Sequence, residues 1–315
     1  MSHGSGFTER VKQELAQRGA GDRGTARAEL AAVLRLGGAL HLHPGAPAEE
    51  RLTLEVGTTS GAVARRTFAL LHRIYDLRPE VQVRAPGGVR RRSTYVVVVA
   101  ARADDLARDI GMLDPDGRPS GDVPAEMVVA DAHALSYVRG AFLAAGSVSA
   151  PGRAAHLEIA TGSDPLAERL AELVARVTEH PAHATTGERP RVVVKSGDTI
   201  GALLAAMGAS GAFLAWDEQR LRRSLRNEAT RLANADAANV RRTIEAAADQ
   251  TAAVAEVLGR LGWDGLPADL REVALVRLAN PAASLAELGE LCDPPVGKSS
   301  VHRRMRRILA LSEDG

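Results

Sequence analysis

Hydrophobic and polar positions follow the same succession of patterns twice in the first two-thirds of the chain. Each copy opens with small and apolar residues at helical spacing that end near a glycine, Gly38 or Gly146. A Leu-Glu-Val or Leu-Glu-Ile alternation typical of a strand comes next, and a second helical pattern follows it. The first helical stretches are residues 29–40 and 137–148, the strands 52–59 and 155–162, and the second helical stretches 62–76 and 165–179.

Each copy then predicts a hairpin and a closing helix. Pro-Gly-Gly separates residues 81–84 from the β-branched run 93–99, and Thr-Gly-Glu-Arg separates a weak strand near His183 from residues 191–195. Closing helices are expected near 104–112 and 199–207. We assign residues 29–112 and 136–208 the same order, α-β-β-α-β-β-α, which makes the fold class α+β with an internal repeat.

The remaining segments predict three further parts. An amphipathic helix over residues 7–18 places Phe7, Val11 and Leu15 on one face, so it should pack on the first copy. From Trp216 to Leu261 the chain is polar and without proline, which favours one or two long helices. We divide the chain into a repeated domain (1–215), with residues 113–127 joining its copies, a helical linker (216–262) and a small C-terminal domain (263–315).

The C-terminal domain predicts three short helices. Residues 270–279 carry Val273, Leu275 and Leu278 as apolar positions, and Pro281 stops that helix. Ser284 and Glu287 have the spacing of a capping box at the start of the next helix. After a Pro-Pro-Val-Gly break, residues 298–309 form the last helix, with Ser299 or Ser300 as its N-cap.

The last helix has an apolar and a basic side. Val301, Met305 and Ile308 share the face that meets the core. Ser300, Arg303 and Arg307 lie opposite, with Arg304 and Arg306 on the flanks. A capped helix, a tight turn and a basic helix are typical of a helix-turn-helix whose second helix enters the major groove. The alternative is a solvated basic helix end.

This arrangement assigns separate roles to the polar residues of the last helix. Arginine makes bidentate contacts with guanine, so Arg303 and Arg307, with Ser300, are the expected base-reading residues. Lys298 and Ser299 stand at the helix start, where phosphate is favoured.

Composition narrows the class of protein. Lys and Arg number 40 against 39 Asp and Glu, so a net charge of +1 excludes a uniformly basic DNA-coating protein, and any nucleic-acid site must be a local cluster. The 3% of aromatic residues disfavours a single-strand binder. A lone cysteine, Cys292, excludes an intramolecular disulfide. No apolar run has the length of a membrane span or signal peptide, so we expect a cytoplasmic protein that does not enter membranes.

Residues 137–148, Tyr-Val-Arg-Gly-Ala-Phe-Leu-Ala-Ala-Gly-Ser-Val, resemble the LAGLIDADG motif of homing endonucleases, with Gly140 and Gly146 at the glycine positions. Small residues would then let the two motif helices pack closely: Ala31, Ala32, Gly140, Ala141 and Ala144.

Over nearly its full length, and above all in residues 284–309, the chain resembles the WhiA family. These bacterial transcription regulators join a degenerate LAGLIDADG domain to a helix-turn-helix similar to region 4 of sigma factors. The resemblance implies promoter DNA as a partner, WhiB and RNA polymerase as candidate protein partners, and a role at the nucleoid in sporulation, cell division and chromosome segregation. The alternative is a scaffold that meets DNA only through such a partner.

An active endonuclease is the less favoured alternative. LAGLIDADG cleavage needs a carboxylate at the end of each motif helix to hold a metal ion. The matching positions here are Gly37 and Ala145, and the nearest acids, Glu29 and Glu158, lie elsewhere. We therefore expect no enzyme activity, no catalytic residue, no metal and no cofactor.

Two weaker features of the sequence are an arginine cluster and a histidine pair. Arg90, Arg91 and Arg92 lie on a hairpin that either contacts DNA or a partner or is simply solvated. His41 and His43 have strand spacing but lack a further ligand, so a surface pair is favoured over a metal site. Because the two copies supply each other's packing surface, we expect a monomer.

Overall fold

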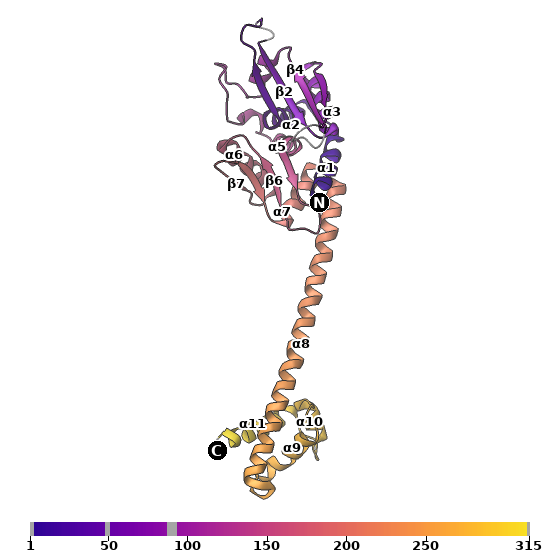
Figure 1. Cartoon of the computed structure of the whole chain (residues 1–315), viewed down its shortest axis with the longest axis vertical. Helices are drawn as coiled ribbons and strands as arrows, with labels where there is room; N and C mark the ends of the chain where they lie inside the picture. Colours follow the sequence, from indigo (N-terminus) through magenta and orange to yellow (C-terminus); the bar gives the residue numbers. More distant parts are fainter. Residues whose placement is uncertain (1–2, 48–50, 87–92, 314–315) are drawn as a thin grey trace. The chain divides into compact units, whose positions relative to one another are not determined.

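The computed structural model describes residues 3–47, 51–86 and 93–313. The chain divides into two compact units, Met1–Arg223 and Ser224–Gly315. In the first unit the expected order α-β-β-α-β-β-α occurs twice (Figure 1). The first copy comprises α2 (Arg23–Gly37), β1 (Gly38–Leu42), β2 (Leu52–Thr58), α3 (Gly61–Tyr75), β3 (Glu80–Arg84), β4 (Thr94–Val99) and α4 (Ala103–Asp109). The second comprises α5 (Asp131–Ala145), β5 (Gly146–Val148), β6 (Leu157–Ala160), α6 (Asp164–Thr178), β7 (His183–Thr185), β8 (Arg191–Val194) and α7 (Gly197–Met207).

Each copy builds one four-stranded antiparallel sheet, in the order β1-β2-β4-β3 or β5-β6-β8-β7. The sequence prediction extended both opening helices too far. Gly38 already pairs with Val56, and Gly146 with Ile159, as the first residues of their strands. The sheet's hydrogen bonds therefore begin directly where each helix ends.

Helix α1 (His3–Ala16) buries Phe7, Val11 and Leu15 as expected. It packs on α3 of the first copy, and, beyond the prediction, also on α5 and β5 of the second, where Thr8 hydrogen-bonds Val148. It ends two residues before the predicted boundary at Arg18. The carbonyl of Arg18 accepts a hydrogen bond from Arg66, and its own guanidinium donates to the carbonyl of Gly208 at 3.3 Å. These tertiary hydrogen bonds occupy Arg18 outside the helix.

The opening helices α2 and α5 lie side by side at the centre of the unit (Figure 1). Small residues allow this approach, as the sequence predicts. A Cβ atom built on Gly140 would lie 2.2 Å from the carbonyl oxygen of Glu29 and 2.9 Å from Cβ of Ala32. Near the other end of the contact, a Cβ on Gly37 would lie 3.4 Å from Cβ of Ala144. The two helices are therefore held together by dispersion contacts between their backbones, where larger side chains would make such contacts in a wider helix pair.

A buried ion network joins three helices of this unit. The carboxylate of Glu29 on α2 is fully buried. It accepts hydrogen bonds from Nε of Arg66 on α3 at 2.7 Å and from Nε of Arg139 on α5 at 2.8 Å. Removing one partner of a buried network leaves uncompensated charge, at a cost of about 3–5 kcal/mol. This network links the first copy to the second through side chains as well as through packing.

The connecting segment between the copies contains the short 3-10 helix η2 (Ala125–Met127). The chain then enters α8 (Ser210–Gly265), a single helix except for a break at Gly262, where φ is 66°. Its start belongs to the first unit, where Trp216 is buried and stacks on Phe7. The described helices include none long and apolar enough to cross a membrane.

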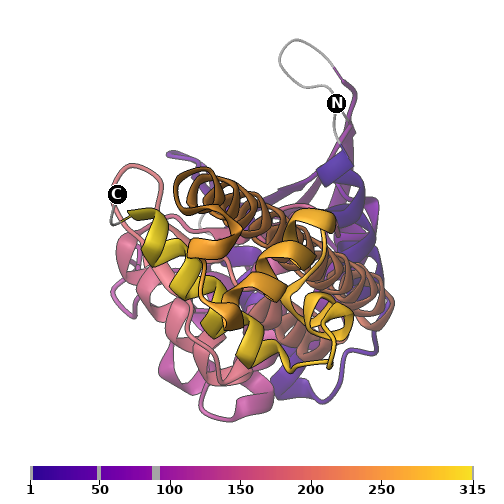
Figure 2. The ribbon, with the colours of Figure 1, turned by 90° about the horizontal axis from the view of Figure 1, so that it is seen from below.

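The second unit gathers α9 (Ala268–Ala279), α10 (Leu285–Leu291) and α11 (Lys298–Glu313) beside the end of α8 (Figure 2). Its core takes side chains from all four helices. The prediction was wrong for Leu275, which is 57% exposed. The core face of α9 instead uses Val273, Ala274, Val276 and the aliphatic stem of Arg277, because the helix turns Leu275 to the opposite side. The core residues are Val254, Val257, Leu266, Leu270, Val273, Ala274, Val276, Leu288, Cys292, Val301, Met305 and Ile308.

Gly140→Ala should destabilise the N-terminal unit by about 3 kcal/mol, because the added methyl group meets backbone that cannot turn aside. Urea unfolding followed by the fluorescence of Trp216, in a Trp263→Phe background, measures this. Gly6→Ala is the matched control, since no atom lies within 4 Å of its added Cβ and alanine favours the helix. Equal stability of Gly140→Ala and the parent protein would contradict the close helix packing.

Ser284→Ala should weaken the start of α10 by about 1 kcal/mol, because the amide of Glu287 loses its acceptor. Hydrogen exchange over residues 285–291 should then quicken about five-fold. Ser284→Thr keeps a capping hydroxyl and should exchange nearly as slowly as the parent. If the alanine and threonine variants behaved alike, the capping hydrogen bond would not be what holds this helix start.

Candidate nucleic-acid interface

The first helix of the candidate interface, α10, begins with the capping box that the sequence predicts. Ser284 Oγ accepts a hydrogen bond from the amide of Glu287, and the amide of Ser284 donates to Glu287 Oε2 at 2.6 Å. The hydrogen bonds from Ser284 lower the pKa of Glu287. The ionised carboxylate therefore supports the helix at neutral pH, and this support is lost as the pH falls through that lowered pKa.

A close backbone approach sets how α10 meets α11. A Cβ on Gly289 would lie 2.1 Å from the carbonyl oxygen of Val296, so only glycine fits there. The amide of Val296 in turn donates to the carbonyl of Gly289 at 2.9 Å. The segment between the helices thus folds back onto α10. Gly289 is not among the predicted site residues, although a glycine inside a helical pattern is a signal of close packing.

The start of α11 differs from the prediction. The carbonyl of Gly297 accepts the first hydrogen bonds of the helix, from the amides of Ser300 and Val301 at 2.9 and 3.2 Å. Gly297 therefore occupies the N-cap position, and Ser299 and Ser300 lie within the first turn instead of capping it. Glycine serves at this position almost as well as serine.

The two sides of α11 are arranged as the sequence predicts. Val301, Met305 and Ile308 are buried in the core of the unit. The opposite side is exposed at Arg303, Arg306 and Arg307. Lys298 and Ser299 are exposed at the helix start, whereas Ser300 and Arg304 are half-buried.

Two of the arginines face acids of α9, which the sequence analysis did not foresee. Arg307 forms an ion pair with Asp269, and Nη1 of Arg304 lies 3.8 Å from Glu272. In the part of the chain that the structure describes, no carboxylate lies within 4.0 Å of the cationic nitrogens of Lys298, Arg303 or Arg306. These three cations therefore present charge to solvent.

The end of each LAGLIDADG-like helix lacks a carboxylate. Gly37 is the last residue of α2, and Ala145 is the last residue of α5. Glu29 is buried between two arginines, as described above. Glu158 lies on β6, 3.4 Å from Nε2 of His156 and 3.7 Å from Nη1 of Arg191.

The other sequence candidates are not brought together. Arg90, Arg91 and Arg92 lie outside the described residues. His41 is 3.8 Å from a carboxylate oxygen of Glu55, and His43 Nε2 is 3.0 Å from Thr53 Oγ1. The two histidines thus contact different residues of the same strand, β2.

Three family models match successive parts of the chain. The WhiA N-terminal LAGLIDADG-like domain matches residues 23–113, the WhiA LAGLIDADG-like domain residues 134–226, and the WhiA C-terminal HTH domain residues 229–312. These ranges correspond to the two repeated copies and to the second unit.

Curated relatives and one solved structure agree with these matches. The probable cell division protein WhiA of Acidothermus cellulolyticus is 40% identical over 98% of this chain and 93% of its own. That of Streptomyces coelicolor is 42% identical over 98% of this chain and 92% of its own. The crystal structure of full-length DUF199/WhiA from Thermatoga maritima has a TM-score of 0.57 at 23% identity and covers 97% of both chains, which supports the fold. On the arrangement of its domains and its likeness to these relatives over nearly the whole length, the chain belongs to the WhiA family.

Proposed function

We propose that this protein is a sequence-specific DNA-binding transcription regulator that reads promoter DNA with α11. The observation that carries the proposal is the exposed basic side of that helix, in a unit that matches a helix-turn-helix domain. The apolar side is fixed in the core by Val301, Met305 and Ile308, so the arginines opposite are held on a rigid support.

Within this proposal Arg303 and Arg307 read bases with Ser300, and Arg306 and Arg304 flank them. The Arg307–Asp269 pair does not remove Arg307 from the interface, because exposed pairs are worth only about 0–1 kcal/mol and exchange partners readily. Arg303 has no such pair to give up among the described residues, so it should contribute more to base reading than Arg307 does. Lys298 and Ser299, exposed at the helix start, hold phosphate.

The names of the relatives support the cell-division part of the proposed biological role. Several of them are named probable cell division protein WhiA. We therefore assign the regulator to cell division and chromosome segregation, and to sporulation where the organism sporulates, acting on the nucleoid in the cytoplasm. WhiB and RNA polymerase are the proposed protein partners. The N-terminal unit is proposed to supply a partner surface or a secondary DNA contact, and the chain is proposed to act as a monomer.

The N-terminal unit is proposed to have lost nuclease activity. A metal-dependent nuclease of this fold needs acids where Gly37 and Ala145 stand, and neither side chain can ligate a metal. In their place the two helix ends contribute small residues to helix packing, since a Cβ on Gly37 would touch Ala144.

Arg303→Ala should lose discrimination at one base pair of the bound sequence, worth about 1–3 kcal/mol, because a bidentate contact is lost. Competition binding of matched and single-mismatch duplexes measures this. Arg231→Ala on α8, also exposed, removes the same charge and should leave the preference among duplexes unchanged. Undiminished discrimination by Arg303→Ala would remove Arg303 from the reading role. A parent protein with no sequence preference, restored only by a partner, would favour the scaffold alternative.

Supercoiled plasmid should stay intact when incubated with the full-length protein and Mg²⁺ or Mn²⁺, because no carboxylate stands at the ends of α2 and α5. Agarose electrophoresis of the plasmid reports nicking and linearisation. The double variant Gly37→Asp, Ala145→Asp, which places a carboxylate at the end of each helix, is tested beside the parent protein as the control for these two positions. Metal-dependent nicking by the parent protein would contradict the proposed loss of catalysis.

A further inference from the structure

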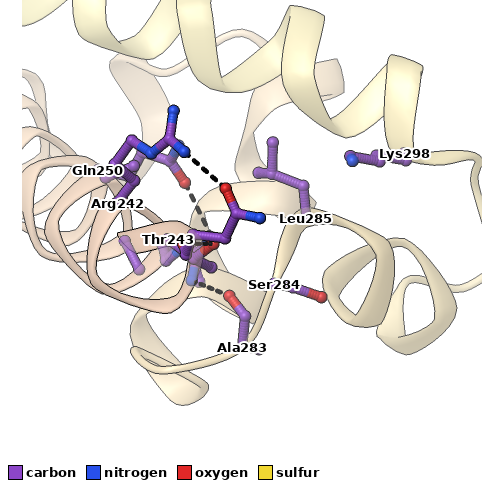
Figure 3. A pocket seen from close by; sticks show the side chains of 11 residues that line it. Arg242, Thr243, Gln250, Ala283, Ser284, Leu285 and Lys298 are labelled. Atoms are coloured by element: carbon purple, nitrogen blue, oxygen red, sulfur yellow. Dashed lines mark hydrogen bonds between the residues drawn. The ribbon is translucent and has the colours of Figure 1, made fainter. Parts of the chain in front are cut away.

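A hollow of about 400 Å³ lies within the C-terminal unit, beside the start of α11 (Figure 3). One wall is the face of α8 that carries Arg242, Thr243 and Gln250. The opposite side is made by the start of α10 at Ser284 and Leu285, and by Lys298. Figure 3 shows Lys298 extending toward the hollow from its own helix. The hollow thus joins α8 to the helix that is proposed to read DNA.

The hollow is positively charged. Arg242, Arg277 and Lys298 line it, and no Asp or Glu is among its described lining residues. Nη2 of Arg242 donates to Asn239 Oδ1 at 2.6 Å, which holds the guanidinium in place without neutralising it. No carboxylate in the described part of the chain lies within 4.0 Å of the cationic groups of Arg242 or Lys298. The chain as a whole has a net charge of only +1, so this cluster of cations without acids is a local concentration of positive charge that would attract an anion.

The buried Arg277 supplies a second, independent observation. It is 1% exposed, with Nη1 donating to the carbonyl of Ala283 at 2.6 Å and Nη2 to Gln250 Oε1 at 2.8 Å. Its Nε–H has no partner in the structure. A buried guanidinium without a carboxylate is costly, and the cost falls when an anion approaches. Its bonds to Ala283 and Gln250 also fix the wall between α8 and the start of α10.

We infer that this hollow binds a phosphate group, held by Arg242 and Lys298 with the Ser284 hydroxyl as a further donor. Lys298 belongs both to the hollow and to the start of α11, so a phosphodiester of the DNA that α11 reads is the favoured source. The inference rests on the proposed function and extends the DNA-binding surface onto α8, beyond the helix-turn-helix. A free phosphate group is the other source of the same chemistry.

The test compares Arg242→Ala with Arg241→Ala in the full chain. Arg241 is the next residue on α8, 76% exposed and absent from the hollow's lining, so both variants lose one exposed positive charge. Binding to a fixed duplex and to random duplexes is measured over a range of salt concentrations. Arg242→Ala should reduce the slope of log K against log salt by about one and weaken binding to all duplexes by the same factor. Arg241→Ala should leave the slope nearly unchanged.

A second arm separates the source of the phosphate. Thermal unfolding of the parent and both variants is compared in sodium phosphate and sodium chloride of equal ionic strength, so that general salt effects cancel between the two variants. A phosphate-dependent rise in Tm that is lost only in Arg242→Ala, with unchanged salt slopes, would support a free phosphate ligand. Equal behaviour of the two variants in both arms would overturn the inference. DNA binding by the parent protein, measured in the same series, tests the proposed function separately.

Discussion

Two helices from different copies of the repeat, α2 and α5, approach so closely that a methyl group on Gly140 would lie 2.2 Å from the carbonyl oxygen of Glu29. The side chain of the same Glu29 accepts hydrogen bonds from Arg66 and Arg139, so backbone packing and charge neutralisation meet at one residue. Both sheets are attached to this pair of helices, because β1 and β5 begin where α2 and α5 end. The packing at the centre of the N-terminal unit therefore depends on a glycine at position 140.

Local patterns were sufficient to predict the order of elements and the two sides of α11, because periodicity and capping act within a few residues of the chain. Contacts made in three dimensions could not be predicted. The pairing of Arg307 with Asp269 joins residues 38 positions apart, and Arg139 with Glu29 joins residues 110 apart. Leu275 is apolar like its buried neighbours on α9, so its sequence does not distinguish it from them. Only the packing of α9 shows that Leu275 faces solvent.

In the C-terminal unit, one set of residues holds α11 in place and another set presents positive charge to solvent. Its core fixes α11 through Val301, Met305 and Ile308, and Gly289 allows the turn to close on α10. The cations without an acid partner among the described residues include Lys298, Arg303 and Arg306 of α11 and Arg242 in the hollow against α8. A nearly neutral chain can bind a polyanion in this way, since contact depends on local charge and not on the total.

The most direct measurement of the central claim is selection of duplexes by the purified full-length protein from a random pool, in the presence of Mg²⁺ and at two salt concentrations. If α11 reads DNA, one motif is enriched at both concentrations, total binding falls as salt rises, and the recovered duplexes are uncut. Recovery of duplexes with no common motif would contradict the claim that this chain recognises a DNA sequence by itself.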